Sequence, residues 1–371
     1  MPWRWNRHVQ EAVAAYLFLL PFALSLLIFF GYAFVRTVYF SFTDYNLFES
    51  PSWVGLQNYL AIIQDNRFLL ALRNSIAFSV IVTLAQTALA LVLAVVMNNR
   101  LRGITVFRTA YYLPSVTSSV VITLMFIWMF QRTGVMNYLI TAAIVYRPVI
   151  LTFLGLTLAA QVLQVLWERW RGRPAGWFEA SLLFVSLVLA AAGTGALWVA
   201  GVTEPVAGVE PVRIVWLNTR RTIPEGGGWW SIPLPLAAIM MLNTWTTAPT
   251  FMLLYLAGLQ DIPKELYEAA EVDGANRWQR FRYITVPMLR PVTFLVMTLG
   301  LIGTLQMFDQ VAVIGSAAPL ESVITLAYYI YHNAFPAGAM PRIGMASAAA
   351  VVLGLLPLIA VLIQRRVVER K

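Results

Sequence analysis

The sequence predicts an all-α membrane protein, a polytopic bundle of about eight transmembrane helices, and its composition and hydropathy are the observations behind this prediction. Hydrophobic residues make up 60% of the 371 residues, charged residues only 12%, and the mean hydropathy is +0.72. Soluble domains carry roughly 25% charged residues, so a bilayer is expected to be the main solvent of this chain. Apolar runs of about 18 residues or more recur along the whole length, which is typical of helices that cross a membrane.

The first apolar run lies close to the N-terminus and follows basic residues, as in a secretory signal peptide. It is longer than the apolar core of a signal peptide, and no A-x-A-like cleavage site follows it, so we expect it to remain as the first span. Seven further runs follow, each near the ~20 residues that cross ~30 Å of hydrocarbon. The eight predicted spans are residues 13–35, 74–97, 109–130, 148–167, 178–201, 232–258, 291–313 and 343–363.

Basic residues set the predicted orientation, because Lys and Arg are enriched in short cytoplasmic loops. Of the 26 Lys and Arg residues, 17 fall in one alternating set of loops and termini and 9 in the other. The richer set contains both termini and the segment 261–291, which we therefore expect in the cytoplasm. The same rule accounts for the net charge of +9 without a nucleic-acid partner.

Two external loops are expected to be ordered. Residues 44–68 look like a short lid with an interfacial helix, and residues 202–230 are rich in β-branched residues, Pro and Gly. Aromatic side chains near the predicted interfaces are expected to anchor the spans: Trp3, Trp5, Trp229 and Trp230.

The segment 261–291 is charged although long apolar runs flank it, and it predicts two short helices joined by a bend. Asp261 is a candidate cap for the first helix, with Pro263 tolerated in its opening turn. Gly274 stands where a left-handed residue ends a helix. Asn276 and Gln279 form an N-x-x-Q arrangement, which predicts a capping box at the start of the second helix.

The first of these helices has a face suited to a partner. Leu266, Ala269, Ala270 and Asp273 recur at three- and four-residue steps and share that face. The adjacent alanines would let a partner surface approach closely, and Glu268 offers a carboxylate at the edge. The alternative is a solvated linker that happens to be helical, which caps and small residues in register do not favour.

The stretch EAAEVDGANRWQRFRYITVPMLRP fits the pattern EAA-x2-DGA-x5-F-x2-I-x2-P-x3-P at every fixed position. It resembles the cytoplasmic loop of permease subunits in binding-protein-dependent ATP-binding-cassette importers. The variant is similar to that of the sugar branch, which handles maltose, other oligosaccharides or glycerol 3-phosphate. Residues 10–135 and 230–368 share the resemblance.

The resemblance implies an ATP-driven importer of a sugar or oligosaccharide in a bacterial or archaeal plasma membrane. This chain would form half of the translocation path, beside a second permease subunit and an external solute-binding protein. The first loop helix would enter a groove on a cytoplasmic ATPase dimer, with Glu268 in a polar contact, Ala269 and Ala270 giving the fit and Gly274 the bend. The other expected coupling residues are Asp273, Phe281 and Pro287.

Two features depart from the family's pattern. Residues 138–228 have no counterpart in the resemblance and are expected to add two spans and an external loop, within a single permease domain of residues 1–371. The usual six-span plan then becomes eight, and the even number keeps the coupling loop, residues 261–291, in the cytoplasm. Residues 316–319 read SAAP where Gly-Gly-Pro is common, so no detail of an outer gate is carried over.

Nucleotide, metal and cofactor sites are not expected on this chain. A P-loop needs G-x4-G-K-[ST], and the two lysines, Lys264 and Lys371, lie in no such motif. ATP and Mg²⁺ are therefore expected on a separate ATPase. The sequence has no Cys and two histidines, His8 and His332, too few for a His-built metal site.

Polar residues inside the predicted spans are candidates for the substrate path. Amide, hydroxyl and indole groups suit a sugar, whose hydroxyls take hydrogen bonds and whose apolar face stacks on a ring. The alternative for the threonines, Asn243 and Gln306 is packing between helices, which we also expect for Gln86. Asp309 fits a gate and a structural role equally well. The candidates are Asn243, Trp245, Thr246, Gln306 and Asp309.

Other membrane functions are less consistent with the sequence. A membrane enzyme would need a cluster of acids, histidines or metal ligands, and neither H-E-x-x-H nor G-x-S-x-G occurs. An ion-coupled carrier predicts ionisable residues in several spans, whereas Asp309 is nearly alone. An importer of the same superfamily for an amino acid or a phosphate ester is the main alternative.

Overall fold

A computed structural model of the chain describes residues 7–98, 104–173, 176–177, 179–228 and 231–369. The extreme chain ends and the proposed anchors Trp3, Trp5, Trp229 and Trp230 lie outside these residues. The chain divides into two compact units, unit 1 with residues 1–125 and 217–371 and unit 2 with residues 126–216. Unit 2 overlaps the segment 138–228; that this segment is atypical of the family stays a prediction, as does the single permease domain.

The described chain is helical, and six helical stretches are long and apolar enough to cross a membrane. The first, His8–Ser41, combines α1 (Arg7–Ser25), the π-helical η1 (Leu26–Gly31) and α2 (Tyr32–Ser41). Another, Arg290–Ala317, runs from α14 (Arg290–Leu305) to η4 (Gly315–Ala317). The remaining four are α4 (Asn66–Met97), α8 (Arg147–Trp170), α9 (Ala180–Val199) and α18 (Ile343–Glu369).

Two further stretches complete the correspondence with the eight predicted spans. The helices α5 (Ile104–Val116) and α6 (Ser119–Met129) form a sharply bent pair, the geometry of either a broken span or a re-entrant loop. The helix α10 (Leu234–Gln260) has 27 residues and lies at the sixth predicted span, although it is not one of the helices long and apolar enough to count as a candidate span. The all-α membrane bundle expected from the sequence is therefore confirmed.

The third predicted span, residues 109–130, is wrong as a single straight helix, because α5 and α6 meet at an angle of 97°. Pro114 supplies no backbone N–H to the last turn of α5. The hydroxyls of Ser115 and Thr117 bond back to the carbonyls of Tyr112 and Leu113, at 2.7 and 2.8 Å. Such bonds compete with the helical ladder, so the helix breaks here.

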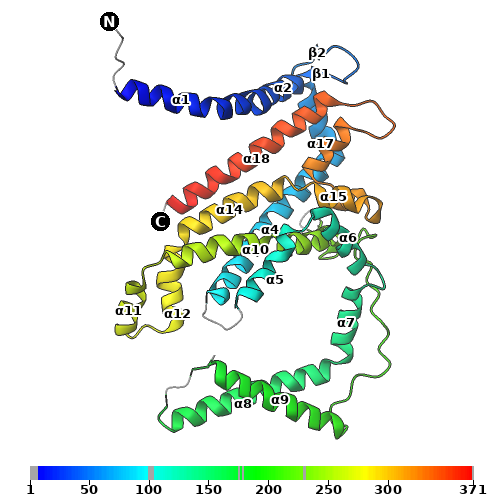
Figure 1. Cartoon of the computed structure of the whole chain (residues 1–371). Coiled ribbons are helices and arrows are strands. Elements are labelled where there is room, and N and C mark those ends of the chain that lie inside the picture. Colours follow the sequence, from blue (N-terminus) through cyan, green and yellow to red (C-terminus); the bar gives the residue numbers. More distant parts are fainter. Residues whose placement is uncertain (1–6, 99–103, 174–175, 178, 229–230, 370–371) are drawn as a thin grey trace. The chain divides into compact units, whose positions relative to one another are not determined.

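The seventh predicted span, residues 291–313, is also interrupted. The helix α14 ends at Leu305, and residues 306–308 separate it from α15 (Asp309–Ile314). The chain then passes through η4, α16 (Leu320–Val323) and α17 (Leu326–Ala334) before α18. Short helices thus fill the end of unit 1 between α14 and α18 (Figure 1).

The helix α4 packs against both α10 and α14, and polar side chains join it to its neighbours. Ser79 and Thr83 of α4 contact the hydroxyl of Thr304 at 3.0 and 3.2 Å. Further along α4, Gln86 accepts a hydrogen bond from Thr247 of α10 at 2.5 Å. The side chain of Gln86 is buried between these helices, as a packing role requires, and the role itself stays a prediction.

Two apolar clusters complete the core of unit 1. One joins α4, α10 and α14 and includes Met97, Met252, Tyr255 and Leu289. The other joins α4, α17, α18 and α3 (Gln57–Gln64). The loop between the first two spans contains α3 and the antiparallel pair β1 (Thr43–Asp44) and β2 (Ser52–Trp53), in agreement with the helix expected there.

A second antiparallel pair, β3 (Thr222–Ile223) with β4 (Ile232–Pro233), precedes α10.

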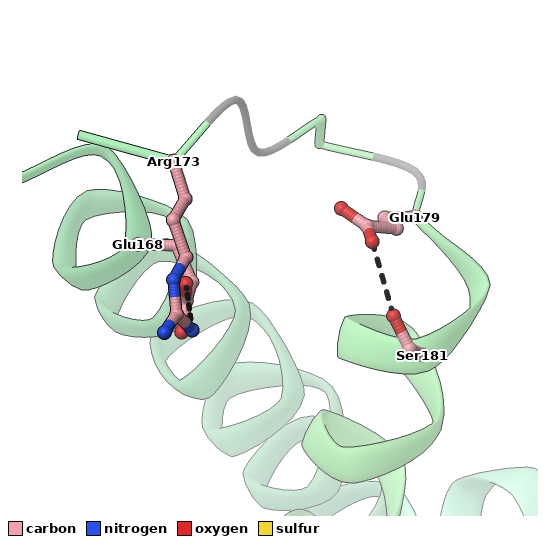
Figure 2. Close-up of polar contacts among 4 residues, drawn as sticks. All are labelled: Glu168, Arg173, Glu179 and Ser181. Atoms are coloured by element: carbon pink, nitrogen blue, oxygen red, sulfur yellow. Dashed lines mark hydrogen bonds and ion pairs between the residues drawn. The ribbon is translucent and has the colours of Figure 1, made fainter. Parts of the chain in front are cut away.

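Unit 2 contains α7 (Val135–Val145) and the packed pair α8 and α9 (Figure 1). Ser186 of α9 donates to Gln161 of α8 at 2.7 Å. At the connection between these helices, Arg173 pairs with Glu168 at 3.3 Å, and Ser181 donates to Glu179 at 3.2 Å (Figure 2).

Candidate functional site

The predicted coupling loop leaves the end of α10 as two short helices joined by a tight turn (Figure 1). The first is α11 (Lys264–Val272) and the second is α12 (Arg277–Arg280). The expected cap at Asp261 is wrong: this residue is the C-cap of α10, and Pro263 occupies the N-cap of α11 without a side-chain bond. Asp261 lies two positions before the N-cap Pro263, with Ile262 between them, and this is too early in the chain for its carboxylate to cap α11.

The end of α11 is a complete Schellman motif. Gly274 has φ of +74°, the left-handed conformation that glycine adopts at no steric cost. Its N–H donates to the carbonyl of Glu271 at 3.0 Å, and the N–H of Ala275 donates to that of Ala270 at 2.8 Å. These two bonds satisfy the last carbonyls of the helix and turn the chain sharply.

The start of α12 is the predicted capping box. The side chain of Asn276 accepts from the N–H of Gln279 at 2.9 Å, and the side chain of Gln279 accepts from the N–H of Asn276 at 2.8 Å. Two otherwise unpaired N–H groups are thereby satisfied. Turn and cap together hold α11 and α12 at a defined angle.

The loop is braced against the membrane helices on one side. The hydroxyls of Tyr267 and Thr285 lie 2.9 Å apart, which joins α11 to the π-helical turn η3 (Phe281–Thr285). Tyr267 and Ile284 also pack on the apolar cluster of α4, α10 and α14. After η3, the short α13 (Val286–Met288) leads directly into α14. Direct contacts therefore join α11 to the membrane helices.

The opposite side of α11 is open. Glu268 and Ala269 are exposed, and Val272 is 88% exposed although its side chain is apolar. Ala270 is only half-buried, since it lies at the edge of this face. Asp273 is exposed at the C-cap, whereas Phe281 and Pro287 are half-buried below the loop. The small and apolar side chains on the open face match the expected docking surface; their role stays a prediction.

The second candidate region is a pocket of about 200 Å³ where the break between α5 and α6 meets the middle of α10. Asn243 and Thr246 of α10 line it, as the sequence predicts. Across from them lie the hydroxyl residues of the break, Ser115, Thr117, Ser119 and Thr123. The buried Oδ1 atom of Asn243 has no hydrogen-bond partner among the described residues. An unpartnered buried acceptor beside a polar pocket suits a ligand hydroxyl.

The other three candidates are not part of this pocket. Trp245 is 45% exposed on another face of α10. Gln306 and Asp309 are exposed at the interruption between α14 and α15, and Gln310 lines the pocket in their place. The hydroxyl residues at the break could have been noticed in the sequence, because the polar run PSVTSSV interrupts an apolar segment. The sequence does not show that this run lines a pocket, because that depends on the 97° bend.

A polar pocket within a bundle of membrane helices, together with an exposed helix braced against that bundle, defines a membrane transport subunit. Residues 86–371 match the family model of the inner membrane component of binding-protein-dependent transport systems, and the chain belongs to this family. The family expected from the loop motif is thus confirmed. The chain is accordingly an inner-membrane transport subunit and not an enzyme.

Relatives of similar length align along most of the chain. The arabinooligosaccharides transport system permease protein AraP of Bacillus subtilis is 28% identical over 363 residues, covering 97% of this chain and 90% of its own. The lactose transport system permease protein LacF of Rhizobium radiobacter is 29% identical over 327 residues, covering 87% and 84%.

A solved structure shares the fold. A chain of a bacterial ABC transporter involved in the import of the acidic polysaccharide alginate matches with a TM-score of 0.65 at 19% identity, covering 98% of each chain. A chain of a bacterial alginate ABC transporter in complex with an alginate pentasaccharide-bound periplasmic protein matches with a TM-score of 0.66 at 20% identity, covering 98% of this chain and 96% of its own.

Proposed function

We propose that this chain is the permease subunit of an ATP-driven importer for a sugar or oligosaccharide, and that α11 docks on a separate cytoplasmic ATPase. The observation that carries the proposal is the geometry of α11. Its face with Glu268 and Ala269 is open, while Tyr267 on its other side is tied to Thr285 and to the apolar cluster of the membrane helices. A helix that is open to a partner and rigidly tied to the bundle is suited to transmit force.

The substrate class rests on the pocket and on the relatives. Hydroxyl groups, an amide and the unpartnered Oδ1 atom of Asn243 suit the many hydroxyls of a sugar. The names of relatives refer to arabinooligosaccharides, lactose and starch degradation products. Both observations support a saccharide over an amino acid, whose ammonium and carboxylate groups would each be expected to meet a charged group in the pocket.

The proposed complex has a second permease subunit, an ATPase dimer and an external solute-binding protein. ATP and Mg²⁺ are bound by the ATPases, because this sequence has no P-loop. Both termini and the loop 261–291 face the cytoplasm, as the distribution of Arg and Lys favours. Closure of the ATPases moves α11, and the bundle alternates between inward- and outward-open forms by rigid-body rocking.

Uptake into proteoliposomes tests this proposal. The permease is reconstituted with its partner subunit, ATPases and binding protein, and ATP-dependent uptake of labelled arabinooligosaccharide, lactose and maltooligosaccharide is compared with that of an amino acid and glycerol phosphate. We expect uptake of at least one saccharide only with ATP inside. Transport of the non-sugar solutes alone would reject the sugar assignment, and ATP-independent uptake would reject the motor.

A further inference from the structure

A larger cavity lies in unit 1, apart from the pocket at the α5–α6 break. It measures about 890 Å³, is open on one side, and is lined by residues of α3, the first turn of α4, α17 and the loop before α18. This volume is within the range of roughly 300–1,000 Å³ that is usual for ligand sites. Amide groups of Gln64, Asn66 and Asn333 and the ring of His332 line it. Neither the coupling loop nor the substrate pocket uses these side chains.

Two arginines give the cavity its charge. Arg67 comes from the first turn of α4, and Arg342 comes from the loop just before α18. Both side chains are exposed, and neither guanidinium makes a hydrogen bond or an ion pair with any residue that the structure describes. Two unpaired guanidiniums that line one cavity attract an anion. Each guanidinium has about five N–H donors, so the pair offers about ten.

The carboxylate of Asp65 also lines the cavity and offsets one of the two arginine charges, which leaves a net charge of +1 from these three groups. Both of its oxygens accept hydrogen bonds from neutral groups, so neither is paired with a guanidinium. One oxygen of Asp65 accepts from the N–H of Arg67 at 2.8 Å, and the other accepts from the hydroxyl of Tyr329 at 2.7 Å. Burial raises the pKa of Tyr329, and the hydrogen bond and charge of Asp65 raise it further. The phenol therefore stays protonated and keeps donating to Asp65.

The walls of the cavity are held in place by the core beneath them. Tyr329 is buried and packs edge-on against Phe68, with ring centroids 5.5 Å apart. Asn333 donates to the carbonyl of Tyr329 at 2.9 Å, and the N–H of Arg342 donates to the carbonyl of Asn333 at 2.9 Å. The backbones that carry both arginines are thus fixed before a ligand arrives, which lowers the entropy cost of binding.

We propose that this cavity is a binding site for an acidic oligosaccharide, in which Arg67 and Arg342 hold the carboxylate of a uronate residue and the surrounding amides hydrogen-bond its ring hydroxyls. Arginine forks bind carboxylates with paired, charge-assisted hydrogen bonds. A lone inorganic anion would leave most of the volume and the amides unused. This inference rests on the proposed function. In the membrane orientation proposed there, the cavity opens to the outside, where the sugar arrives.

Binding to the assembled importer tests the site directly. The complete complex is placed in lipid nanodiscs without its binding protein, and the equilibrium affinities of a galacturonate trimer and of the neutral galactose trimer are compared. We expect the acidic trimer to bind more tightly. Arg67→Gln and Arg342→Gln should each weaken it about tenfold, in line with the loss of one charged hydrogen bond, and leave the neutral trimer unchanged.

Two variants serve as controls. Arg67→Lys keeps the positive charge and should retain more of the affinity for the acidic trimer than Arg67→Gln. This comparison distinguishes a loss of charge from a disturbance of folding as the cause of weaker binding. Arg213→Gln removes an equal charge from the loop 202–230, which is predicted on the same side of the membrane and does not line the cavity; it should have no effect.

Three results would overturn the proposal. The first is equal affinity for the acidic and neutral trimers, and the second is displacement of the acidic trimer by inorganic phosphate at the same concentration. The third is that Arg67→Gln binds the acidic trimer as tightly as the wild type but needs a higher concentration of binding protein for uptake. The cavity would then be a contact surface for the binding protein and not a sugar site. Uptake of the transported sugar by the wild-type complex with its binding protein is measured separately, so a failure of the proposed function is recognised on its own.

Discussion

The Nη1 atom of Arg280 lies 3.0 Å from the Oε2 atom of Glu271, and this ion pair bridges α12 to α11 across the turn at Gly274. The Arg280 side chain is only 21% exposed, whereas that of Glu271 is 70% exposed. The pair therefore has one fixed and one solvated partner, and it supports the geometry that the Schellman turn and the capping box already define.

Breaking this pair should have a small effect. An ion pair with a solvated partner contributes about 0.2–1 kcal/mol, so Arg280→Gln should weaken binding of the ATPase by no more than about fivefold. The exchange Glu271→Arg with Arg280→Glu should recover most of the loss. Affinity is measured by titrating the purified ATPase against the permease in nanodiscs. A hundredfold loss would mean that Arg280 contacts the ATPase itself.

Gly274→Asp should insert into the membrane normally and lose both ATPase assembly and uptake. A side chain at φ of +74° costs roughly 1–2 kcal/mol, and the strain lies in the turn that sets the angle of α11. Co-purification of the ATPase and sugar uptake are the measurements. Gly172 has the same φ of +74° and the same open surroundings after α8, so Gly172→Asp is the matched control and should keep uptake. Normal uptake by Gly274→Asp would count against docking through α11.

Thr246→Val should raise the sugar concentration for half-maximal uptake about fivefold, because a lost hydrogen bond costs ~1 kcal/mol. Thr246 lines the pocket at the α5–α6 break. Thr244 lies on the same helix, does not line the pocket, and donates to the carbonyl of Met240 at 2.8 Å. Thr244→Val is therefore the control. Equal changes in the two variants would show that the threonines act through helix packing.

Gly344→Ala should destabilise unit 1, because a Cβ atom there would overlap the backbone oxygen of Thr43. Backbone has little freedom to move aside, so we expect a loss of about 1–3 kcal/mol in the free energy of unfolding. Gly354→Ala lies on the same helix with nothing within 4 Å of the added Cβ. It should be neutral or stabilising by up to ~1 kcal/mol. Thermal unfolding in nanodiscs compares the two, and similar melting temperatures would contradict the expected overlap.

Much of the local structure could be predicted from neighbouring residues. The turn at Gly274 and the box of Asn276 and Gln279 depend on contacts within three to five residues, and the structure has both. Asp261 shows the limit of such reasoning, since a capping residue two positions before Pro263 served the end of α10 instead. Local rules do not decide which of two adjoining helix ends a residue will cap.

The membrane pocket was only partly predictable. Asn243 and Thr246 were found because polar residues in an apolar span are unusual, but the same rule selected Gln306 and Asp309, which lie outside the pocket. Ser115, Thr117, Ser119 and Thr123 were missed because a straight helix over residues 109–130 would not bring all of them to one place. The bend brings these four residues to one pocket, and the spacing of apolar residues along the sequence does not show where a helix bends.

The sequence by itself determined that the chain enters a membrane, about where its spans lie, and which loop carries the coupling motif, because hydropathy and helix capping act over short distances along the chain. Only the tertiary structure decided that Tyr267 braces α11 on the bundle, that a broken helix meets α10 at a polar pocket, and that Arg67 and Arg342 share one cavity. These relationships join residues up to 275 positions apart in the chain. They depend on how helices pack, which no local pattern specifies.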